Sequence, residues 1–403
     1  MTSGRTGCDH RVNPANRPMA ITVVGAGTRF LSGMSYYTIR LANAFASRHR
    51  VSVITMRRLL PARFYPGRNR IGASLTRLTY DPAIKVHDGV DWFWFPSLFG
   101  ALASLARRRP RVIIFQWWTG TVLHSYLFLA LAARLAGARV VIEFHEILDT
   151  GEDAIPFAKQ YVNLIAPLFV RLAAGYVIHS EADRAALQGR YRLGGRPVAV
   201  IPHGPYDHHR GTLEGTVRTA PASALNLLFF GVIRPFKGLE DLVAAFNALP
   251  PERIDDYWLT VVGETWEGWT LPLEMIEQSP YRDRISVVNR YVHDDEVAAY
   301  FAAADAVVLP YHRSSASGPA HTAMSHGLPL VITEVGGLPH AVAGYAGAIL
   351  VPARDPAALQ AALERLPAMR GVKFADPHSW ERTLDRYEVL FADIGVSRSD
   401  AGV

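Results

Sequence analysis

The sequence predicts an α/β protein made of two doubly wound, Rossmann-like domains. Strand-like apolar runs alternate with amphipathic helical runs over nearly the whole chain, which is the pattern of parallel sheets built from strand–helix–strand units. The polar stretch 207–223 interrupts this series, and a second series follows it. A chain of 403 residues that is 49% hydrophobic also exceeds what one core commonly accommodates.

Each half of the chain contributes its own set of expected elements. In the first half, a strand at 20–24, the turn Gly25-Ala26-Gly27 and a helix carrying Tyr37, Leu41 and Phe45 on one face form the opening unit. Further strands of the first half are expected at 51–55, 112–115, 140–144, 175–179 and 198–201, and a buried helix is expected within 122–138. In the second half we expect strands at 225–230, 258–262, 285–288, 306–309 and 329–333, with helices at 239–248, 296–303 and 319–326.

The domain organisation follows from these runs. We expect a disordered leader at 1–18, a first domain at 19–206, a linker at 207–223 and a second domain at 224–376. In open α/β sheets ligands bind beyond the carboxyl ends of the strands, so the cleft between the two domains is the expected site.

The cysteine content and the N-terminal residues indicate the cellular compartment. The single cysteine, Cys8, excludes an internal disulfide, and residues 1–18 lack the apolar core of a secretory signal, so we expect a cytoplasmic protein.

The net charge of +6 is uneven: residues 57–77 hold six arginines and no acid. We expect this basic segment, Arg57 to Arg77, to meet an anionic membrane surface rather than nucleic acid, the alternative being a solvated basic surface. The run 98–105, followed by Arg107, Arg108, Arg109 and Arg111, has the form of an interfacial helix.

Several motifs match a known functional site only in part. Because a required residue is missing in each, the corresponding chemistry is excluded. Phe30 stands where the dinucleotide fingerprint needs a small residue, and the loop around Lys237 lacks the Gly-Lys-Ser/Thr ending of a phosphate-binding loop. His145-Glu146 is followed by Asp149 where a zinc-protease helix needs its second histidine. No Asp-x-Asp occurs, so we expect no metal ion bridging a diphosphate and no cofactor. His203, His208 and His209 could ligate a metal or form a solvated, hydrogen-bonded cluster.

Three glycine-rich turns in the second half each follow a strand. The first, 230–238, places Arg234 and Lys237 between glycines, where they could stabilise the pyrophosphate of a departing nucleotide without a metal. The second, 311–319, combines hydroxyls, a glycine and Pro319 at a helix start, the form of an anion-binding helix N-terminus. The third is Glu334-Val335-Gly336-Gly337-Leu338-Pro339.

These residues resemble glycosyltransferase family 4, the retaining family of the GT-B fold, over about residues 20–394. The resemblance rests on Lys237-Gly238, Val261-Val262-Gly263, the Ser314–Gly318 loop, Ala323-Met324-Ser325-His326-Gly327-Leu328-Pro329 and Val335-Gly336-Gly337-Leu338-Pro339. In the first half it rests on Gly33, His145-Glu146, Ser180-Glu181-Ala182 and Ile201-Pro202-His203-Gly204. It also implies that a C-terminal helix within 377–394 crosses back to the first domain.

The resemblance implies roles for the matching positions. Lys237, assisted by Arg234, would hold the donor diphosphate, and His145 would contact the transferred sugar; a buried structural histidine is the alternative. Gly33, Gly231 and Gly263 would let the backbone approach the donor. The remaining donor-binding positions would be Ser314, Ser317, Gly318, Pro319, His321 and Thr322.

The chain departs from the common pattern of the family at three positions. Val232 stands where many members have an arginine, and Ser314 and Thr322 stand where two glutamates are common. His321 or Thr322 would then have to bind the donor ribose.

The implied function is retaining transfer of a sugar from a nucleoside-diphosphate sugar to a hydroxyl acceptor without a metal ion, by a hexosyltransferase-type enzyme. A GT-B sugar-nucleotide epimerase would need an acid and a base, for which Glu146, Asp149 and Glu264 are the candidates. A non-catalytic protein that binds sugar nucleotides or a membrane surface is the other alternative.

Overall fold

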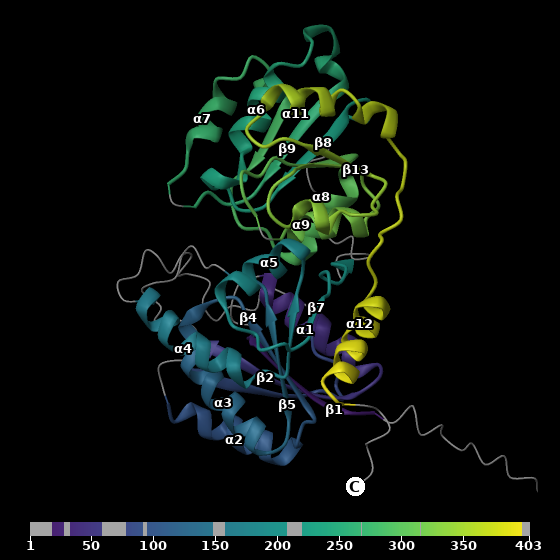
Figure 1. Ribbon diagram of the computed structural model, residues 1–403. Helices are drawn as coiled ribbons and strands as arrows, with labels where there is room; N and C mark the ends of the chain where they lie inside the picture. Colours follow the sequence, from purple (N-terminus) through teal and green to yellow (C-terminus); the bar gives the residue numbers. More distant parts are fainter. Residues whose placement is uncertain are drawn as a thin grey trace, which may run out of the picture.

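A computed structural model describes residues 18–27, 33–58, 78–91, 95–147, 158–207, 220–266, 268–314 and 316–396. The described chain forms two parallel sheets in separate layered domains, one above the other in Figure 1, each sheet with helices on both faces. The α/β class and the two doubly wound domains predicted from the sequence are confirmed.

The first sheet has seven strands in the order β3-β2-β1-β4-β5-β6-β7, and every neighbouring pair is parallel. The strands are β1 (Ala20–Ala26), β2 (Arg50–Arg58), β3 (Lys85–Asp91), β4 (Val112–Trp117), β5 (Arg139–Phe144), β6 (Gly175–Ile178) and β7 (Val198–Val200). The central strands read as continuous β-branched and aromatic runs because helices cover both of their faces.

The helices of the first domain divide between two cores. They are α1 (Gly33–Ala46), α2 (Ser97–Arg108), α3 (Leu123–Leu135), α4 (Ala158–Leu172) and α5 (Glu181–Arg190), with a short 3₁₀ turn at Gly120–Val122. One core contains buried residues of α2, α3, α4 and α5, and the other contains residues of α1 together with the C-terminal helix. None of the described helices combines the length and apolar character that a membrane crossing requires.

The second sheet has six strands in the order β10-β9-β8-β11-β12-β13. They are β8 (Leu225–Phe230), β9 (Tyr257–Val262), β10 (Ile285–Val288), β11 (Ala306–Leu309), β12 (Leu330–Thr333) and β13 (Ala348–Val351). The helices are α6 (Leu239–Asn247), α7 (Leu271–Glu277), α8 (Asp294–Ala303), α9 (Gly318–Ser325), α10 (Leu338–Ala341) and α11 (Pro356–Leu363). Short 3₁₀ turns lie at Pro235–Lys237, Pro251–Asp256, Arg282–Arg284 and Leu366–Met369.

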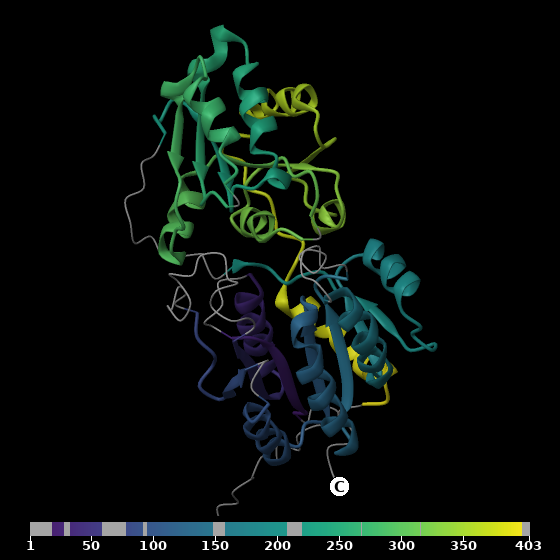
Figure 2. The same cartoon turned by 90° about the vertical axis from the view of Figure 1, so that its left-hand side faces the viewer.

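The last helix, α12 (Trp380–Asp393), packs on the first domain although it follows the second. Figures 1 and 2 show the chain leaving the second domain and running down to lie beside α1. Leu384, Tyr387, Leu390 and Phe391 of α12 are buried with Phe45 of α1 in one core.

Two strands were not expected from the sequence. The edge strand β3 contains only two apolar residues, Val86 and Val90, and its first half is largely exposed, so no apolar run signals it. β13 is four residues long and lies at the other sheet's edge. Residues 1–17 and 208–219, which make up most of the expected leader and linker, lie outside the described residues, and the domain bounds stay predictions.

A close contact between the turn after β7 and α12 predicts the effect of one substitution. A Cβ added at Gly204 would lie 2.7 Å from Cη2 of Trp380, which is closer than carbon atoms pack. We expect Gly204→Ala to destabilise the protein by about 1–3 kcal/mol, measured as a lower midpoint of thermal unfolding. Gly189→Ala is the matched control, because a Cβ there has open space and alanine favours the helix. Equal midpoints for the two variants would contradict the role of this contact.

Candidate active site where the two domains meet

The carboxylate of Glu143, near the carboxyl end of β5, organises the first-domain part of the site. Its side chain is fully buried. The hydroxyls of Tyr37 (α1) and Tyr387 (α12) each donate to Oε1 at 2.7 Å, and Gln116 Nε2 lies 3.3 Å from Oε2. Burial by itself raises the pKa of Glu143, but the nearby imidazoles of His145 and His179 and the Tyr37 hydroxyl outweigh it and lower the pKa to about 2. A buried carboxylate therefore stays ionised among three elements of the fold.

His145 follows β5 directly and faces this carboxylate. Its backbone N–H donates to the carbonyl of Trp117 at 2.9 Å, which extends the pairing of β5 with β4 by one residue. The imidazole is buried, with Nε2 3.8 Å from Glu143 Oε2 and Nδ1 3.1 Å from His179 Nε2. The predicted sugar-contacting residue thus lies in a defined orientation at the end of a central strand.

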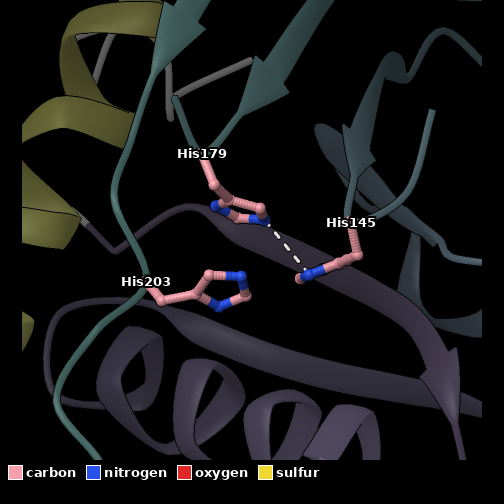
Figure 3. Close-up of side chains that lie close together, drawn as sticks. All are labelled: His145, His179 and His203. Atoms are coloured by element: carbon pink, nitrogen blue, oxygen red, sulfur yellow. Dashed lines mark hydrogen bonds between the residues drawn. The ribbon is translucent and has the colours of Figure 1, made fainter. Parts of the chain in front are cut away.

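Two further histidines gather around His145 and form a group shown in Figure 3. His179 follows β6 and its Nδ1 lies 2.8 Å from the carbonyl oxygen of Ile201. The ring of His203, from the segment after β7, stacks on that of His179 with centroids 3.8 Å apart. Burial lowers the pKa of His179 to about 4 and also lowers the pKa of His203. His203 is buried rather than solvated, while His208 and His209 lie outside the described residues.

This histidine group contacts the second domain at α9. The ring centroid of His203 lies 5.8 Å from that of His321, which in turn stacks on Tyr206 at 5.7 Å. His321 and Thr322 are both buried, and burial lowers the pKa of His321 to about 3. The Thr322 hydroxyl donates to the carbonyl of Gly318 within the same helix, at 3.1 Å. The two residues predicted to replace the missing ribose-binding glutamate therefore lie at the domain boundary.

The predicted donor loops of the second domain pack directly on one another. Gly238 has φ +63° and Gly336 has φ +52°, and a Cβ on these residues would overlap the carbonyl oxygens of Pro310 and Ser314 respectively. Gly263 similarly leaves room only for the carbonyl oxygen of Gly231. Glycine is required where backbones approach this closely or adopt positive φ, so the three glycine-rich turns form one continuous surface.

Two hydroxyl groups of the 311–319 loop, those of Ser314 and Ser317, form hydrogen bonds within the loop and with the start of α9. Ser317 caps α9 by accepting from the Ala320 N–H at 3.2 Å, and Ser314 Oγ donates to the Ala316 carbonyl at 2.6 Å. Pro319 lies in the first turn of α9, and Gly318 begins that helix. A ligand at this loop would therefore meet backbone N–H groups rather than these hydroxyls.

Positive charge collects beside these turns. Lys237 Nζ lies 3.6 Å from the ring centroid of Tyr311, and the Arg234 guanidinium lies 4.9 Å from that of Phe236. Arg313, to which the sequence analysis gave no role, lies at the same distance from the Phe236 ring. In the part of the chain that the structure describes, no carboxylate lies within ion-pair distance of Lys237.

Some of these residues were predicted from the sequence to lie at the site, and others were not. The structure joins the Lys237 loop to the Ser314 loop through Tyr311, and it joins His145 to His179, which the analysis placed at the end of a strand. Gly33 begins α1, and residues 28–32 before it lie outside the described chain. Among the epimerase candidates, Glu264 accepts from Trp266 Nε1 at 2.8 Å, Glu146 is exposed, and Asp149 lies outside the described residues.

Two family models match the chain, one in each half. The glycosyl transferase 4-like domain matches residues 32–204, and the glycosyl transferases group 1 model matches residues 224–368.

Curated relatives carry the name D-inositol 3-phosphate glycosyltransferase. The protein of Pseudarthrobacter chlorophenolicus is 35% identical over 296 residues, 68% of this chain and 68% of that protein. The protein of Arthrobacter sp. (strain FB24) is 28% identical over 315 residues, 71% of this chain and 72% of that protein. In the relatives from Geodermatophilus obscurus and Segniliparus rotundus the match spans about half of their length, 51% and 50%.

Solved structures share the fold at low sequence identity. A glycosyltransferase from Rickettsia africae has a TM-score of 0.64 at 14% identity, covering 94% of this chain and 100% of that one. Anabaena HepE in complex with UDP has a TM-score of 0.59 at 16% identity, covering 93% of this chain and 96% of that one.

The tyrosine hydroxyls on Glu143 give a stability prediction. Tyr387→Phe removes one donor from a buried carboxylate, and we expect a loss of about 1.5–3 kcal/mol in the free energy of unfolding. Tyr126→Phe is the matched control, because the buried Tyr126 hydroxyl donates at 2.9 Å to a neutral acceptor, the Gln116 carbonyl, and its loss costs about 1 kcal/mol. Urea unfolding followed by tryptophan fluorescence measures both. A loss for Tyr387→Phe no larger than the control's would contradict the role assigned to Glu143.

Proposed function

The chain belongs to glycosyltransferase family 4, and we propose that it transfers a sugar from a nucleoside-diphosphate sugar to a hydroxyl acceptor with retention of the anomeric configuration. The observation that carries this proposal is the arrangement in the second domain. Lys237, with no carboxylate at ion-pair distance among the described residues, stands beside three interlocked glycine-rich turns and the N-terminus of α9. Such a surface is suited to a diphosphate whose negative charge grows as the sugar departs.

The proposed roles follow from position. Lys237 and Arg234 stabilise the leaving diphosphate, so that no metal ion is needed to bridge it. Arg313 lies on the same aromatic side chain as Arg234 and adds a third cation near the phosphates. His145, oriented by Glu143 and His179, contacts the sugar near its reacting carbon. His321 and Thr322 of α9 lie toward the ribose.

The comparisons suggest which substrates to try first. HepE was solved with UDP, and the curated relatives are named for D-inositol 3-phosphate. We therefore propose a uridine diphosphate sugar as donor and a phosphorylated polyol as the first acceptor class. A thermal-shift screen of UDP, GDP and their sugars identifies the donor, since a ligand that binds the folded state raises its unfolding temperature.

Epimerase activity has weaker support. Glu264 is engaged by the Trp266 indole and Glu146 is exposed, so these two candidates do not supply the acid and the base that an epimerase needs. Incubation with a nucleotide sugar alone separates the alternatives: epimerisation would yield an isomerised donor, and a purely binding protein would leave donor and acceptor unchanged.

Lys237 provides the test of the proposed chemistry. We expect Lys237→Ala to lower kcat/KM on the order of 10²–10³-fold, because one fixed positive charge is lost from the transition state. Lys85→Ala, at an exposed lysine of the edge strand β3, is the control and should retain full activity. Proton NMR of the product reports the anomeric configuration. Inversion at the anomeric carbon, or equal rates for the two variants, would refute the mechanism.

We also propose that the protein is cytoplasmic and docks on an anionic membrane surface, through a patch different from the one the sequence indicated. Arg57 is ion-paired with the buried Asp91, Nε to Oδ1 at 3.2 Å, and the side chains of the other five arginines of segment 57–77 lie outside the described residues. The apolar face of α2 that the sequence indicated is not exposed, since Leu98, Ala101 and Leu105 are buried against the domain.

Within the described part of the chain, an exposed apolar patch lies on α2, α3, α4 and Phe95 before α2. Phe95 contacts the rings of Phe99 and Phe128 at 6.0 and 5.3 Å. The exposed apolar side chains of this patch are Phe95, Phe99, Phe128, Leu131, Leu135, Leu164 and Leu168. Arg107 and Arg108 lie in the last turn of α2. Apolar side chains beside cations are what an anionic lipid surface attracts.

Vesicle sedimentation tests the patch. We expect wild-type protein to sediment with vesicles containing phosphatidylserine and not with neutral ones, because each cation near an anionic surface adds about 1 kcal/mol. Phe95→Ser combined with Phe99→Ser should abolish sedimentation, whereas Leu271→Ser, at an exposed leucine of the second domain, should not. Equal recovery on both vesicle types would exclude membrane docking.

A further inference from the structure

The three first-domain histidines make a donor set that the glycosyl-transfer proposal does not use as a group. We infer that His145, His179 and His203 form a binding site for one divalent transition-metal ion of the zinc type. These imidazoles are separate from the donor diphosphate, for which no metal is proposed. With both of its ring nitrogens engaged, His145 would meet the proposed sugar only through its ring carbons.

The first support is the spacing of the ring nitrogens. One nitrogen from each residue lies within 4.8 Å of the other two, and His145 Nδ1 is 3.1 Å from His179 Nε2. Tetrahedral zinc with bonds of about 2.0–2.1 Å holds its ligand nitrogens roughly 3.3 Å apart. The closest pair already meets this spacing, and the widest separation must shorten by about 1.5 Å. His203, on the chain segment after β7 (Figure 3), is stacked on His179 with ring centroids 3.8 Å apart, so its ring must turn out of this stack for the three nitrogens to face one ion.

The second support is the surroundings of the ring nitrogen that does not bind the ion, which is Nδ1 in His179 and Nε2 in His145. His179 Nδ1 lies 2.8 Å from the Ile201 carbonyl, which fixes the proton on Nδ1 and leaves Nε2 with a lone pair. His145 coordinates through Nδ1 only when its ring proton is on Nε2, and Glu143 Oε2, 3.8 Å from Nε2, stabilises that form. Metal-bound histidines characteristically donate their second N–H to a backbone carbonyl or a carboxylate. His179 has such a carbonyl at hydrogen-bond distance, and the Glu143 carboxylate lies near His145 but beyond hydrogen-bond distance, 3.8 Å away.

The third support is the unmet hydrogen bonding and the charge of the group. In the described structure His145 Nε2 and His203 Nδ1 are buried without a hydrogen-bond partner, which is uncommon in a folded protein. Coordination through the opposite nitrogen of His145 would put a proton on Nε2, toward Glu143. The carboxyl group of Glu143, 3.8 Å from the imidazoles of His145 and His179, is placed to offset part of an ion's charge. Three imidazole nitrogens suit zinc, cobalt, nickel and copper better than magnesium or calcium, which prefer oxygen.

Cobalt(II) titration of the untagged full-length protein tests the inference, because tetrahedral cobalt absorbs far more strongly in the visible range than cobalt in water. We expect a saturable band at one equivalent of Co²⁺ that one equivalent of Zn²⁺ removes. His179→Ala and His203→Ala should each weaken binding more than tenfold, and Glu143→Gln should weaken it about 10–100-fold, as for other second-sphere partners. His293→Ala, at an exposed histidine of the second domain, is the matched control and should bind as wild type.

The possible outcomes decide the inference even if a variant fails to fold. The wild-type spectrum is independent of the variants: a titration that yields only the weak absorption of hydrated cobalt overturns the site. A strong band that survives in correctly folded His179→Ala and His203→Ala, verified by circular dichroism, also overturns it. A band lost in these variants and kept in His293→Ala supports it.

Discussion

The buried carboxylate of Glu143 is the interaction on which the first-domain half of the site depends. An ionised group at this depth is tolerated only when hydrogen bonds and nearby polar groups replace its lost hydration. Tyr37 from α1 and Tyr387 from α12 supply hydroxyls, and Gln116 from β4 supplies an amide. The same carboxylate faces His145 and His179, so the need to satisfy one charge also sets the orientation of the imidazoles at the domain boundary.

In the second domain the main constraint is the close approach of backbone groups from different loops. Gly238, Gly263 and Gly336 each stand where a neighbouring carbonyl oxygen leaves no room for a side chain. The loops after β8, β9, β11 and β12 can therefore stack into one surface beside Lys237. Catalytic groups that rest on packed loops of this kind need little rearrangement when charge develops on the substrate.

The fold class and the glycine-rich turns after the strands could be predicted from the sequence because both depend on local patterns. Alternating strand and helix runs, and glycines after strands, are visible within a few residues of each other. The strand β3 was not predicted, because its residues show no apolar run. His179 was expected in a strand, but β6 ends one residue earlier at Ile178, and that single step places the imidazole in the loop beside His145. The partner that completes Glu143, Tyr387, lies 244 positions away along the chain, and no local pattern in the sequence reports such a contact.

The return of α12 to the first domain has a consequence for how the protein is made. A chain emerging from the ribosome exposes its N-terminal sheet long before residues 380–393 are synthesised, and domains generally fold as they appear. Yet Leu384, Leu390 and Phe391 of α12 belong to the core on one face of that sheet. Until the second domain has been translated, that face of the first domain is therefore covered by α1 without α12, and Glu143 lacks the hydroxyl of Tyr387. The first domain, although it is synthesised first, is completed only after the second domain has been synthesised.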